Sequence, residues 1–272
     1  MKRFLLATAM AMTVVAGPAH AQLNFDPNQV AILRWYKADQ ATSFFLVGNP
    51  VAVAFDGACI WAVSVNANNV TKLRANDGTI LGTFSVGLAP RGLAYDGANM
   101  WVANSGDNTV TALDGLGGVF VTVPVGNAPF GVAFDGANIW VTNTLSNNVT
   151  KLGASDGFVL GTFPVFSAPV AAAFDGANIW VANVGSDNVT KLRASDGKVL
   201  GTFVVGHEPV GVVFDGANIW VANKLSNNVT KLQASNGAKL GTFPLSAAPS
   251  GSMAFDGANI WVQGIPGIAW KL

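Results

Sequence analysis

FDGANIW at residues 174–180 is the stretch that decides the fold, because the same seven residues recur at 134–140, 214–220 and 255–261. Counting its variants, the tryptophans that end the motif lie 39 to 41 residues apart: Trp61, Trp101, Trp140, Trp180, Trp220 and Trp261. Copies at such a regular spacing, repeated along nearly the whole chain, indicate a repeat architecture.

Each period contains four short apolar segments separated by turn residues. In the period that begins at Pro209, the segments read GVVFD, NIWVAN, NVTKLQ and KLGTFPL. They are rich in Val, Ile, Phe, Trp and Thr, which favour strands. The intervening Asp215-Gly216 and Asn236-Gly237 pairs supply the positive φ angles of tight hairpins. Each period is therefore predicted to be a four-stranded antiparallel meander.

A repeated unit of this size can be a propeller blade, a coil of a β-solenoid or a separate bead on a string. A sheet of about 40 residues cannot bury both of its faces alone, and solenoid coils need far fewer residues per turn. Blades packed face to face around an axis fit best. The sequence thus predicts an all-β fold, a six-bladed β-propeller of four-stranded antiparallel blades with about 40 residues per blade.

The two ends of the chain carry incomplete sets of strands. Residues 30–50 match the third and fourth segments of a period, and residues 252–272 match the first, the second and a third segment. A composite last blade would remove the free sheet edge, so we expect the ring to be closed by N- and C-terminal strands. One of the two third-strand candidates, Val30–Tyr36 or Gly267–Leu272, is then surplus or lies at the rim.

The first 21 residues have the pattern of a secretory signal peptide. Lys2 and Arg3 form a basic start, Phe4–Ala16 is apolar, and Ala19-His20-Ala21 is an A-x-A cleavage site. The apolar stretch is shorter than the roughly 20 residues that a membrane-spanning helix needs. We therefore expect cleavage after Ala21, one propeller domain over residues 22–272, and a periplasmic or secreted protein.

The composition of the expected mature chain excludes several classes of protein. Without Lys2 and Arg3, 13 basic residues stand against 15 acidic ones, so no basic surplus is left for nucleic acid. No later apolar run is long enough to predict a membrane span. Cys59 is the only cysteine, which excludes an internal disulfide. It stands where the other copies have asparagine, which indicates a drifted turn residue.

The repeat carries a family resemblance. Its pattern P-x-G-V-A-F-D-G-A-N-I-W-V-A-N, followed by N-N-V-T-K-L-x-A-S-D-G-x-x-L-G-T-F, resembles the bacterial YVTN and NHL-type β-propeller repeats over about residues 30–272. That group includes YncE-like proteins and, more distantly, virginiamycin B lyase. The resemblance implies the fold but no single activity, because such propellers serve as binding scaffolds, lyases and lactonase-like enzymes. For the lyases it implies histidine and acidic residues acting with magnesium.

Departures from the repeat mark the candidate site. His207 is the only histidine of the expected mature chain and Glu208 the only glutamate, and both lie in the connection that leads into the fifth period. Lys224 lies in a loop of the same period, and Arg91 lies three periods away. These loops share one face of a meander blade, so we predict that a ligand binds at the face and channel mouth bearing His207, Glu208, Lys224 and Arg91.

The Asp-Gly hairpins lie on the opposite face. Their six aspartates are interpreted as turn formers and not as a calcium ring, because calcium needs about six or more oxygens converging within one loop. They are Asp56, Asp96, Asp135, Asp175, Asp215 and Asp256. A zinc site is excluded, since one histidine and one cysteine in different periods cannot supply three or four ligands.

Two functions stay open, and no residue is assigned as catalytic. The leading hypothesis is a non-catalytic binding or scaffold protein, with a protein, glycan or small molecule as its unknown ligand and with no cofactor. The alternative is a metal-assisted lyase or lactonase-like enzyme using the His207/Glu208 face. An imidazole beside a carboxylate can move protons or bind a metal, so only this alternative requires a divalent metal.

Overall fold

The computed structural model describes residue 46, residues 48–264 and residues 267–272. The expected signal peptide, the strand candidate Val30–Tyr36 and nearly all of the expected N-terminal closing segment lie outside the described residues. The described chain forms 23 β-strands and one short 3-10 turn, η1 (Val184–Ser186). Within it, no helix has the length and apolar character to cross a membrane.

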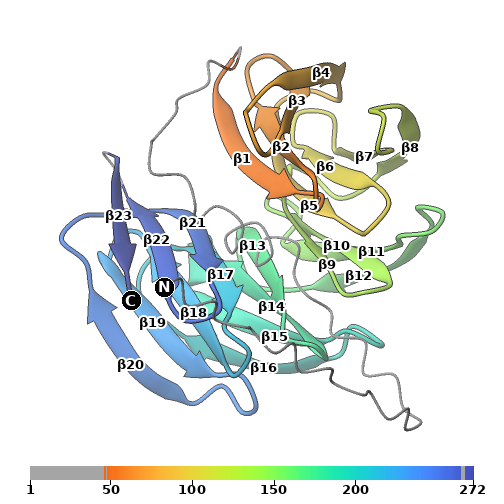
Figure 1. Cartoon of the computed structure of the whole chain (residues 1–272). Coiled ribbons are helices and arrows are strands. Elements are labelled where there is room, and N and C mark those ends of the chain that lie inside the picture. The colour runs from red at the N-terminus through yellow and green to blue at the C-terminus, as the bar shows by residue number, and fades with distance from the viewer. Residues whose placement is uncertain (1–45, 47, 265–266) are drawn as a thin grey trace, which may run out of the picture.

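The strands form six sheets, called blades 1 to 6 here, in chain order around a common centre (Figure 1). Blade 1 contains β1 (Pro50–Phe55), β2 (Cys59–Ser64), β3 (Asn69–Arg74) and β4 (Ile80–Ser85). Blade 2 contains β5 (Pro90–Tyr95), β6 (Met100–Asn104), β7 (Thr109–Leu113) and β8 (Val119–Pro124). Blade 3 contains β9 (Pro129–Phe134), β10 (Asn138–Asn143), β11 (Asn148–Gly153) and β12 (Val159–Pro164).

The second half of the chain continues the pattern. Blade 4 contains β13 (Pro169–Phe174), β14 (Asn178–Asn183), β15 (Asn188–Arg193) and β16 (Val199–Val204). Blade 5 contains β17 (Pro209–Phe214), β18 (Asn218–Asn223), β19 (Asn228–Gln233) and β20 (Lys239–Pro244). Blade 6 contains β21 (Pro249–Phe255), β22 (Ile260–Gly264) and β23 (Ile268–Lys271).

Each of blades 1 to 5 is a four-stranded antiparallel meander, and blade 6 has three strands among the described residues. The predicted six-bladed propeller of antiparallel meanders is confirmed. Of the two third-strand candidates, the C-terminal one holds the third position, because β23 pairs with β22 through Trp261 and Lys271. Closure by N-terminal strands falls outside the described residues and stays a prediction.

The first strand of every blade is the inner one. Successive inner strands pack against one another along the chain, from β1 on β5 through to β17 on β21. A corresponding contact between β21 and β1 is not among these packed pairs in the ranges that the structure describes. Figure 1 shows blades 1 and 6 standing apart on this side of the ring.

The core lies between neighbouring blades. Trp180 of blade 4 packs in one cluster with Ile219, Val221 and Leu232 of blade 5. The ring of Trp180 also stacks on Phe203 of its own blade, with 5.3 Å between the ring centroids. The same arrangement recurs around Trp140, whose cluster includes Ile179 of the next blade. The motif tryptophans of blades 1 to 5 therefore fill the space between neighbouring blades.

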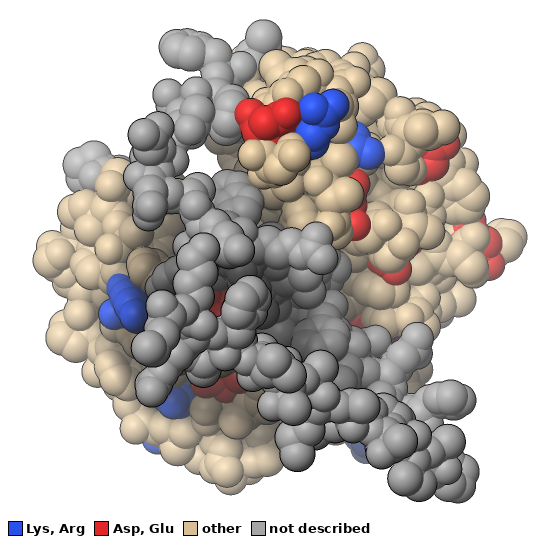
Figure 2. All heavy atoms as spheres, in the orientation of Figure 1, with Lys and Arg blue, Asp and Glu red and all other residues tan. Residues whose placement is uncertain are grey.

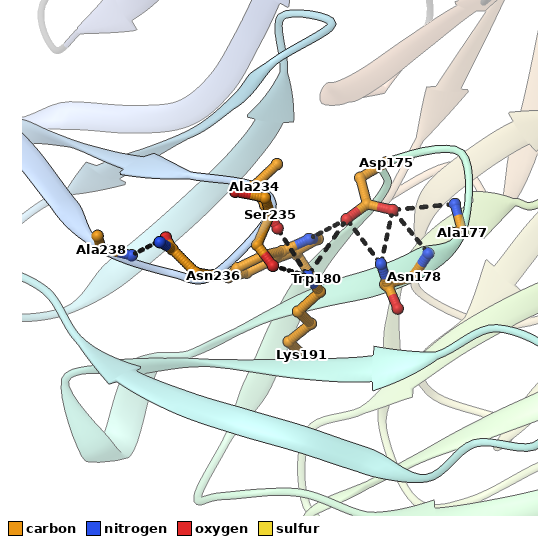
Figure 3. A network of polar contacts seen from close by, with 9 residues as sticks. All are labelled: Asp175, Ala177, Asn178, Trp180, Lys191, Ala234, Ser235, Asn236 and Ala238. Carbon is orange, nitrogen blue, oxygen red and sulfur yellow. Dashed lines mark hydrogen bonds and ion pairs between the residues drawn. The ribbon is translucent and has the colours of Figure 1, made fainter.

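A lysine in the third strand fastens each of several blades to the next. The Nζ atom of Lys191 lies 5.0 Å from the centroid of the Trp180 ring. It donates a hydrogen bond of 2.6 Å to the carbonyl oxygen of Ala234 in blade 5, beside that of Ser235 (Figure 3). Lys72 and Lys151 make equivalent bonds to the following blades. Each of these lysines thus combines a cation–π contact to its tryptophan with a charge-assisted hydrogen bond to the next blade.

The Asp-Gly hairpins also have one common geometry. Asp175 Oδ1 accepts hydrogen bonds from the backbone N–H groups of Ala177 and Asn178, and Oδ2 accepts one of 2.7 Å from the Trp180 indole (Figure 3). The other blades repeat the indole bond, as Trp61, Trp101, Trp140, Trp220 and Trp261 show. The interpretation of these aspartates as turn formers is confirmed, and they also orient the tryptophans.

Candidate functional site

The candidate site is built from two loops that lie side by side. The connection between β16 and β17 carries His207 and Glu208, and the loop between β18 and β19 begins with Lys224. The Lys224 N–H donates to the Glu208 carbonyl at 2.8 Å, and the His207 N–H donates to Ser226 Oγ at 2.7 Å. The structure therefore brings His207, Glu208 and Lys224 onto one face.

His207 has a partner that the sequence reasoning did not identify. Its Nδ1 atom lies 2.7 Å from Oδ2 of Asp187, which belongs to the loop between β14 and β15 of the preceding blade. The exposed fractions of the two side chains are 71% for His207 and 41% for Asp187. The pair spans the boundary between blades 4 and 5 and is open to solvent.

Asp187 also belongs to a clamp that recurs between blades. Its Oδ1 accepts a hydrogen bond of 2.9 Å from the Glu208 N–H, and elsewhere an asparagine accepts the equivalent bond from an alanine N–H. The equivalent pairs are Asn68 with Ala89, Asn108 with Ala128, and Asn147 with Ala168. The Glu208 N–H and His207 lower the pKa of Asp187, in that order of effect. Asp187 thus serves the clamp and His207 together.

A signal for Asp187 was present in the sequence. The other copies have asparagine before Asn-Val-Thr or Thr-Val-Thr, as in NNVT and NTVT, whereas blade 4 reads DNVT. Asparagine and aspartate both tolerate the left-handed backbone at this position, where φ of Asp187 is 52°. Because asparagine and aspartate build the same turn, the exchange of asparagine for Asp187 gives no sign of a role from the turn alone. Its role becomes clear only from the contact with His207.

The remaining charges of this loop pair face solvent. Lys224 is exposed and Glu208 is half-buried, and neither side chain forms an ion pair or hydrogen bond with another residue in the described part of the chain. Figure 2 shows how few charged side chains the drawn surface carries. In this setting, a histidine, an aspartate, a glutamate and a lysine within three neighbouring loops are a local concentration of charge.

Arg91 lies elsewhere. It is on the inner strand β5, and its guanidinium carbon lies 5.6 Å from the ring centroid of Phe130 on the inner strand β9. No described contact joins Arg91 to His207, Glu208 or Lys224. The four predicted site residues therefore form two places on the same face: the His207 loop pair and the Arg91 position at the start of an inner strand.

Apolar side chains on this face were also missed by the sequence reasoning. Leu225, next to Lys224, is 68% exposed. Leu145 is exposed in the equivalent loop of blade 3, and Leu88 and Phe166 are exposed in the connections that lead into blades 2 and 4. Large apolar side chains are exposed on the opposite face as well, since Leu116 and Phe158 lie in third-to-fourth turns, so Leu225 marks contact area without distinguishing the two faces. The opposite face carries the Asp-Gly hairpins, whose carboxylates are engaged within their own turns.

The residues present do not fit the magnesium that the lyase resemblance implies. Among the described residues, no group of three or more His, Cys, Asp or Glu side chains converges as a metal site. His207 and Asp187 are only two candidate ligand residues, and their mutual hydrogen bond occupies Nδ1 of His207 and Oδ2 of Asp187. Cys59 offers no reactive thiol either, since it is buried at the start of β2 and burial raises the pKa of its thiol.

Comparisons with known proteins find the fold in other structures. No protein-family model and no curated protein sequence matches the chain. Hydrazine synthase of Kuenenia stuttgartiensis is similar in structure, with a TM-score of 0.70, 20% identity, and coverage of 83% of this chain and 76% of that one. Catalytically inactive virginiamycin B lyase of Staphylococcus aureus with quinupristin has a TM-score of 0.71 and 17% identity, with coverage of 85% and 87%.

A third similar structure has no known function. It is a functionally unknown protein from Desulfotomaculum acetoxidans, with a TM-score of 0.69, 16% identity, and coverage of 79% of this chain and 78% of that one. At such identities the likeness shows the fold alone, and the same propeller is found in proteins with different functions. The choice between a binding scaffold and an enzyme therefore has to be argued from the site.

Proposed function

We propose that the protein is an exported binding protein of the YncE-like kind, whose ligand contacts the face formed by the β16–β17 connection and the β18–β19 loop. One observation carries this proposal: departures from the repeat gather on this face, with side chains free to make contacts. The charges of Glu208 and Lys224 are available, the His207–Asp187 pair is exposed, and Leu225 adds apolar area. Loops held by a rigid scaffold are common binding sites.

The opposite face supports the same proposal by contrast. Its aspartates accept two backbone bonds and one indole bond each, so they have little capacity left for a ligand. Because the hydrogen-bond acceptor sites of these carboxylates are occupied within the turn, the aspartates stabilise the fold and do not face a ligand. Export is part of the proposal and rests on the signal-peptide pattern of residues 1–21. The ligand class at the His207 loop pair stays open among proteins, glycans and small molecules.

A second candidate function is favoured by the His207–Asp187 pair alone. A carboxylate bonded to Nδ1 orients an imidazole and leaves Nε2 for proton transfer, as in general acid–base catalysis. The described residues place no third converging group beside this pair, and the metal called for by a metal-assisted mechanism has no fitting ligand set. A lyase or lactonase-like activity therefore ranks below binding.

A thermal-stabilisation screen tests the binding function. The purified protein is heated with metal salts, sugars, lactones and peptidoglycan fragments, because a ligand at about 100 times its Kd stabilises the folded state by about 2.7 kcal/mol. A ligand that raises Tm is then titrated against His207→Ala and Glu208→Gln. We expect both variants to bind more weakly while keeping the Tm of the free protein.

The control has to be an exposed residue of the opposite face. Lys198→Ala fits, because Lys198 is exposed in the β15–β16 turn. Asp175→Asn is unsuitable, since Asp175 holds its hairpin and the Trp180 indole. Weaker binding in Lys198→Ala, with unchanged binding in the other two variants, would place the ligand on the wrong face for this proposal. Turnover of a lactone that is lost in Asp187→Asn would favour the enzyme.

A further inference from the structure

The ring of inner strands has one residue that departs from its otherwise uncharged chemistry. Among all residues of the six inner strands, Arg91 is the only one with a charged side chain. It directly follows Pro90, the first residue of β5. At the same position the other inner strands have Val51, Phe130, Val170, Val210 and Ser250. A single cation is thus set in a ring that is otherwise apolar, apart from one hydroxyl.

Close backbone packing begins one residue further along the inner strands. A Cβ added to Gly92 would overlap the carbonyl oxygen of Phe130, and one added to Gly211 would overlap that of Gly251. One added to Gly131 would lie 2.6 Å from the Val170 oxygen. Neighbouring inner strands therefore touch at this level, where β5, β9, β17 and β21 have glycine and the other two strands have only Ala52 and Ala171. The residues that precede it, including Arg91, form the last layer before the face of the propeller.

Phe130 holds the Arg91 guanidinium in place from one side. The distance of 5.6 Å to the ring centroid is within the range of a cation–π contact. Phe130 is 37% exposed, so part of the ring remains available beside the cation. A planar guanidinium stacked on a ring loses little entropy when its N–H groups bind a carboxylate.

Arg91 also differs from the other described arginines in lacking a carboxylate. Arg74 pairs with Asp77 at 3.0 Å, and Arg193 pairs with Asp196 at 3.2 Å. Arg91 forms no ion pair within the part of the chain that the structure describes. A half-buried guanidinium in an apolar ring is a site for an external anion, because its five N–H donors match a carboxylate in two parallel bonds.

We propose that Arg91 and Phe130, at the start of two neighbouring inner strands, bind a small monocarboxylate with an apolar or aromatic body. The guanidinium takes the carboxylate, and Phe130, with Val51 and Val170 on the adjoining inner strands, takes the body. One cation balances one negative charge, while Glu208 and Asp187 on the same face disfavour a dianion such as phosphate. This inference deepens the proposed function. It rests on that function in one respect, because both place a ligand on this face.

The test uses phenylacetate, hexanoate, phenylacetamide and inorganic phosphate as probes of the full-length protein. Binding is followed by saturation-transfer NMR and by titration calorimetry at millimolar probe concentrations. We expect both carboxylates to bind, and the neutral amide and phosphate to bind at least about tenfold more weakly, because a charge-assisted bidentate bond is lost or mismatched.

Two variants separate charge from general surface effects. Arg91→Gln keeps much of the length of the side chain and should lose at least about tenfold in carboxylate affinity, since the charge-assisted bond is removed. Arg193→Gln is the matched control, because Arg193 is an exposed arginine at the end of β15, and it should bind as the wild type does. A folded Arg91→Gln protein shows the wild-type Tm.

Three outcomes would overturn the inference: wild-type affinity in Arg91→Gln, equal binding of phenylacetamide, or no binding of either carboxylate to the wild type. Preference for phosphate would also overturn it. The proposed function fails separately. If a ligand from the screen is lost in His207→Ala while phenylacetate does not bind, the His207 loop pair stands and the Arg91 site falls. Loss of phenylacetate in Arg91→Gln alone supports the Arg91 site without the loop pair.

Discussion

Blades 4 and 6 carry the same FDGANIW motif in different surroundings. In blade 4, Trp180 is fully buried, stacks on Phe203 and lies under Lys191, which is bonded to blade 5. In blade 6, Trp261 is 36% exposed, and Lys271 lies 5.8 Å from its ring centroid. No aromatic ring stacks on Trp261 among the described residues. The motif therefore specifies a local turn by itself, but it contributes core packing only when a following blade covers it.

The largest expected effect comes from removing the two tryptophans in turn. Trp180→Ala should lower the free energy of unfolding by about 3–5 kcal/mol, as for other buried aromatic residues replaced by alanine. Trp261→Ala should cost about 1–2 kcal/mol, because folding buries less of the apolar surface of Trp261 than of Trp180. Chemical denaturation of both variants measures the difference. Equal losses would show that the last blade is packed as tightly as the fourth, and a Trp180→Ala loss below about 1 kcal/mol would show that the tryptophans do not hold the blades together.

A pair of glycines sharpens the same comparison within covered blades. Gly197 has φ of 73°, and an added Cβ would overlap the Phe163 ring of the preceding blade. Gly197→Ala should cost about 2–4 kcal/mol from strain and overpacking together. Gly176 has φ of 96° with nothing within 4 Å of an added Cβ, so Gly176→Ala should show the backbone strain alone, about 1–2 kcal/mol. Thermal unfolding of both variants gives the contribution of the blade contact, which must be positive for this account to hold.

Deleting residues 22–47 tests the expected closure of the ring between blades 6 and 1 by N-terminal strands. If N-terminal strands close the last blade, their loss should cost on the order of 2 kcal/mol, because each cross-strand pair contributes about 0.2–1 kcal/mol. In a domain of this size, that lowers Tm by several degrees. Differential scanning calorimetry measures the change. An unchanged Tm would mean that the propeller is stable without N-terminal closure.

The smallest expected effect concerns acid stability, and it should be similar in the two regions. Burial raises the pKa of Asp215, but the Trp220 indole, Asn218 and the backbone N–H groups outweigh it, so the pKa lies below its usual range. The Trp261 indole is the main cause of the lowered pKa of Asp256. A lowered folded-state pKa gives stability that is complete above the unfolded value, about 3.9, and is lost as pH falls below it.

Asparagine variants provide the readout for acid stability. Tm is measured between neutral pH and strong acid for the wild type, Asp215→Asn and Asp256→Asn. Each variant should lose part of the acid-dependent fall in Tm. The corresponding change in the free energy of unfolding should be no more than about 1 kcal/mol, because solvent partly screens these half-buried carboxylates. A flattened profile in Asp215→Asn alone would mean that even the turn of the last blade depends on a covering neighbour.

The sequence predicted most of the fold because the fold is repetitive. Period, strand composition and Asp-Gly turns all recur, so each copy supported the same interpretation. The candidate site was predicted in part. His207, Glu208 and Lys224 were placed on one face, but Asp187 was missed, because its contact with His207 crosses between blades while its exchange for asparagine preserves the turn.

The Arg91 position shows a second limit. Sequence distance separates Arg91 from Phe130 by a whole period, yet the two occupy the same register position in adjacent blades and are therefore in contact. Comparing that position across the periods would have suggested the pairing. The exposure of Trp261 could not be predicted from the sequence, because its motif is identical to those of blades 3, 4 and 5. The exposure depends instead on what packs against blade 6.

The turn between β19 and β20 has a consequence for the lifetime of the protein. Asn236 is the only asparagine in the chain followed by glycine, whereas the equivalent turns contain Asp77, Asp156 and Asp196. Its side chain accepts the Ala238 N–H, as Asp196 accepts that of Lys198. Asn-Gly bonds deamidate through a succinimide with loss of ammonia. Opening to aspartate would give Asn236 the residue of its sister turns, whereas opening to isoaspartate would lengthen the backbone beside Gly237, which is packed against the Phe203 ring. Ageing of this protein in storage would thus produce one species that matches the repeat and one that disturbs the contact between blades 4 and 5.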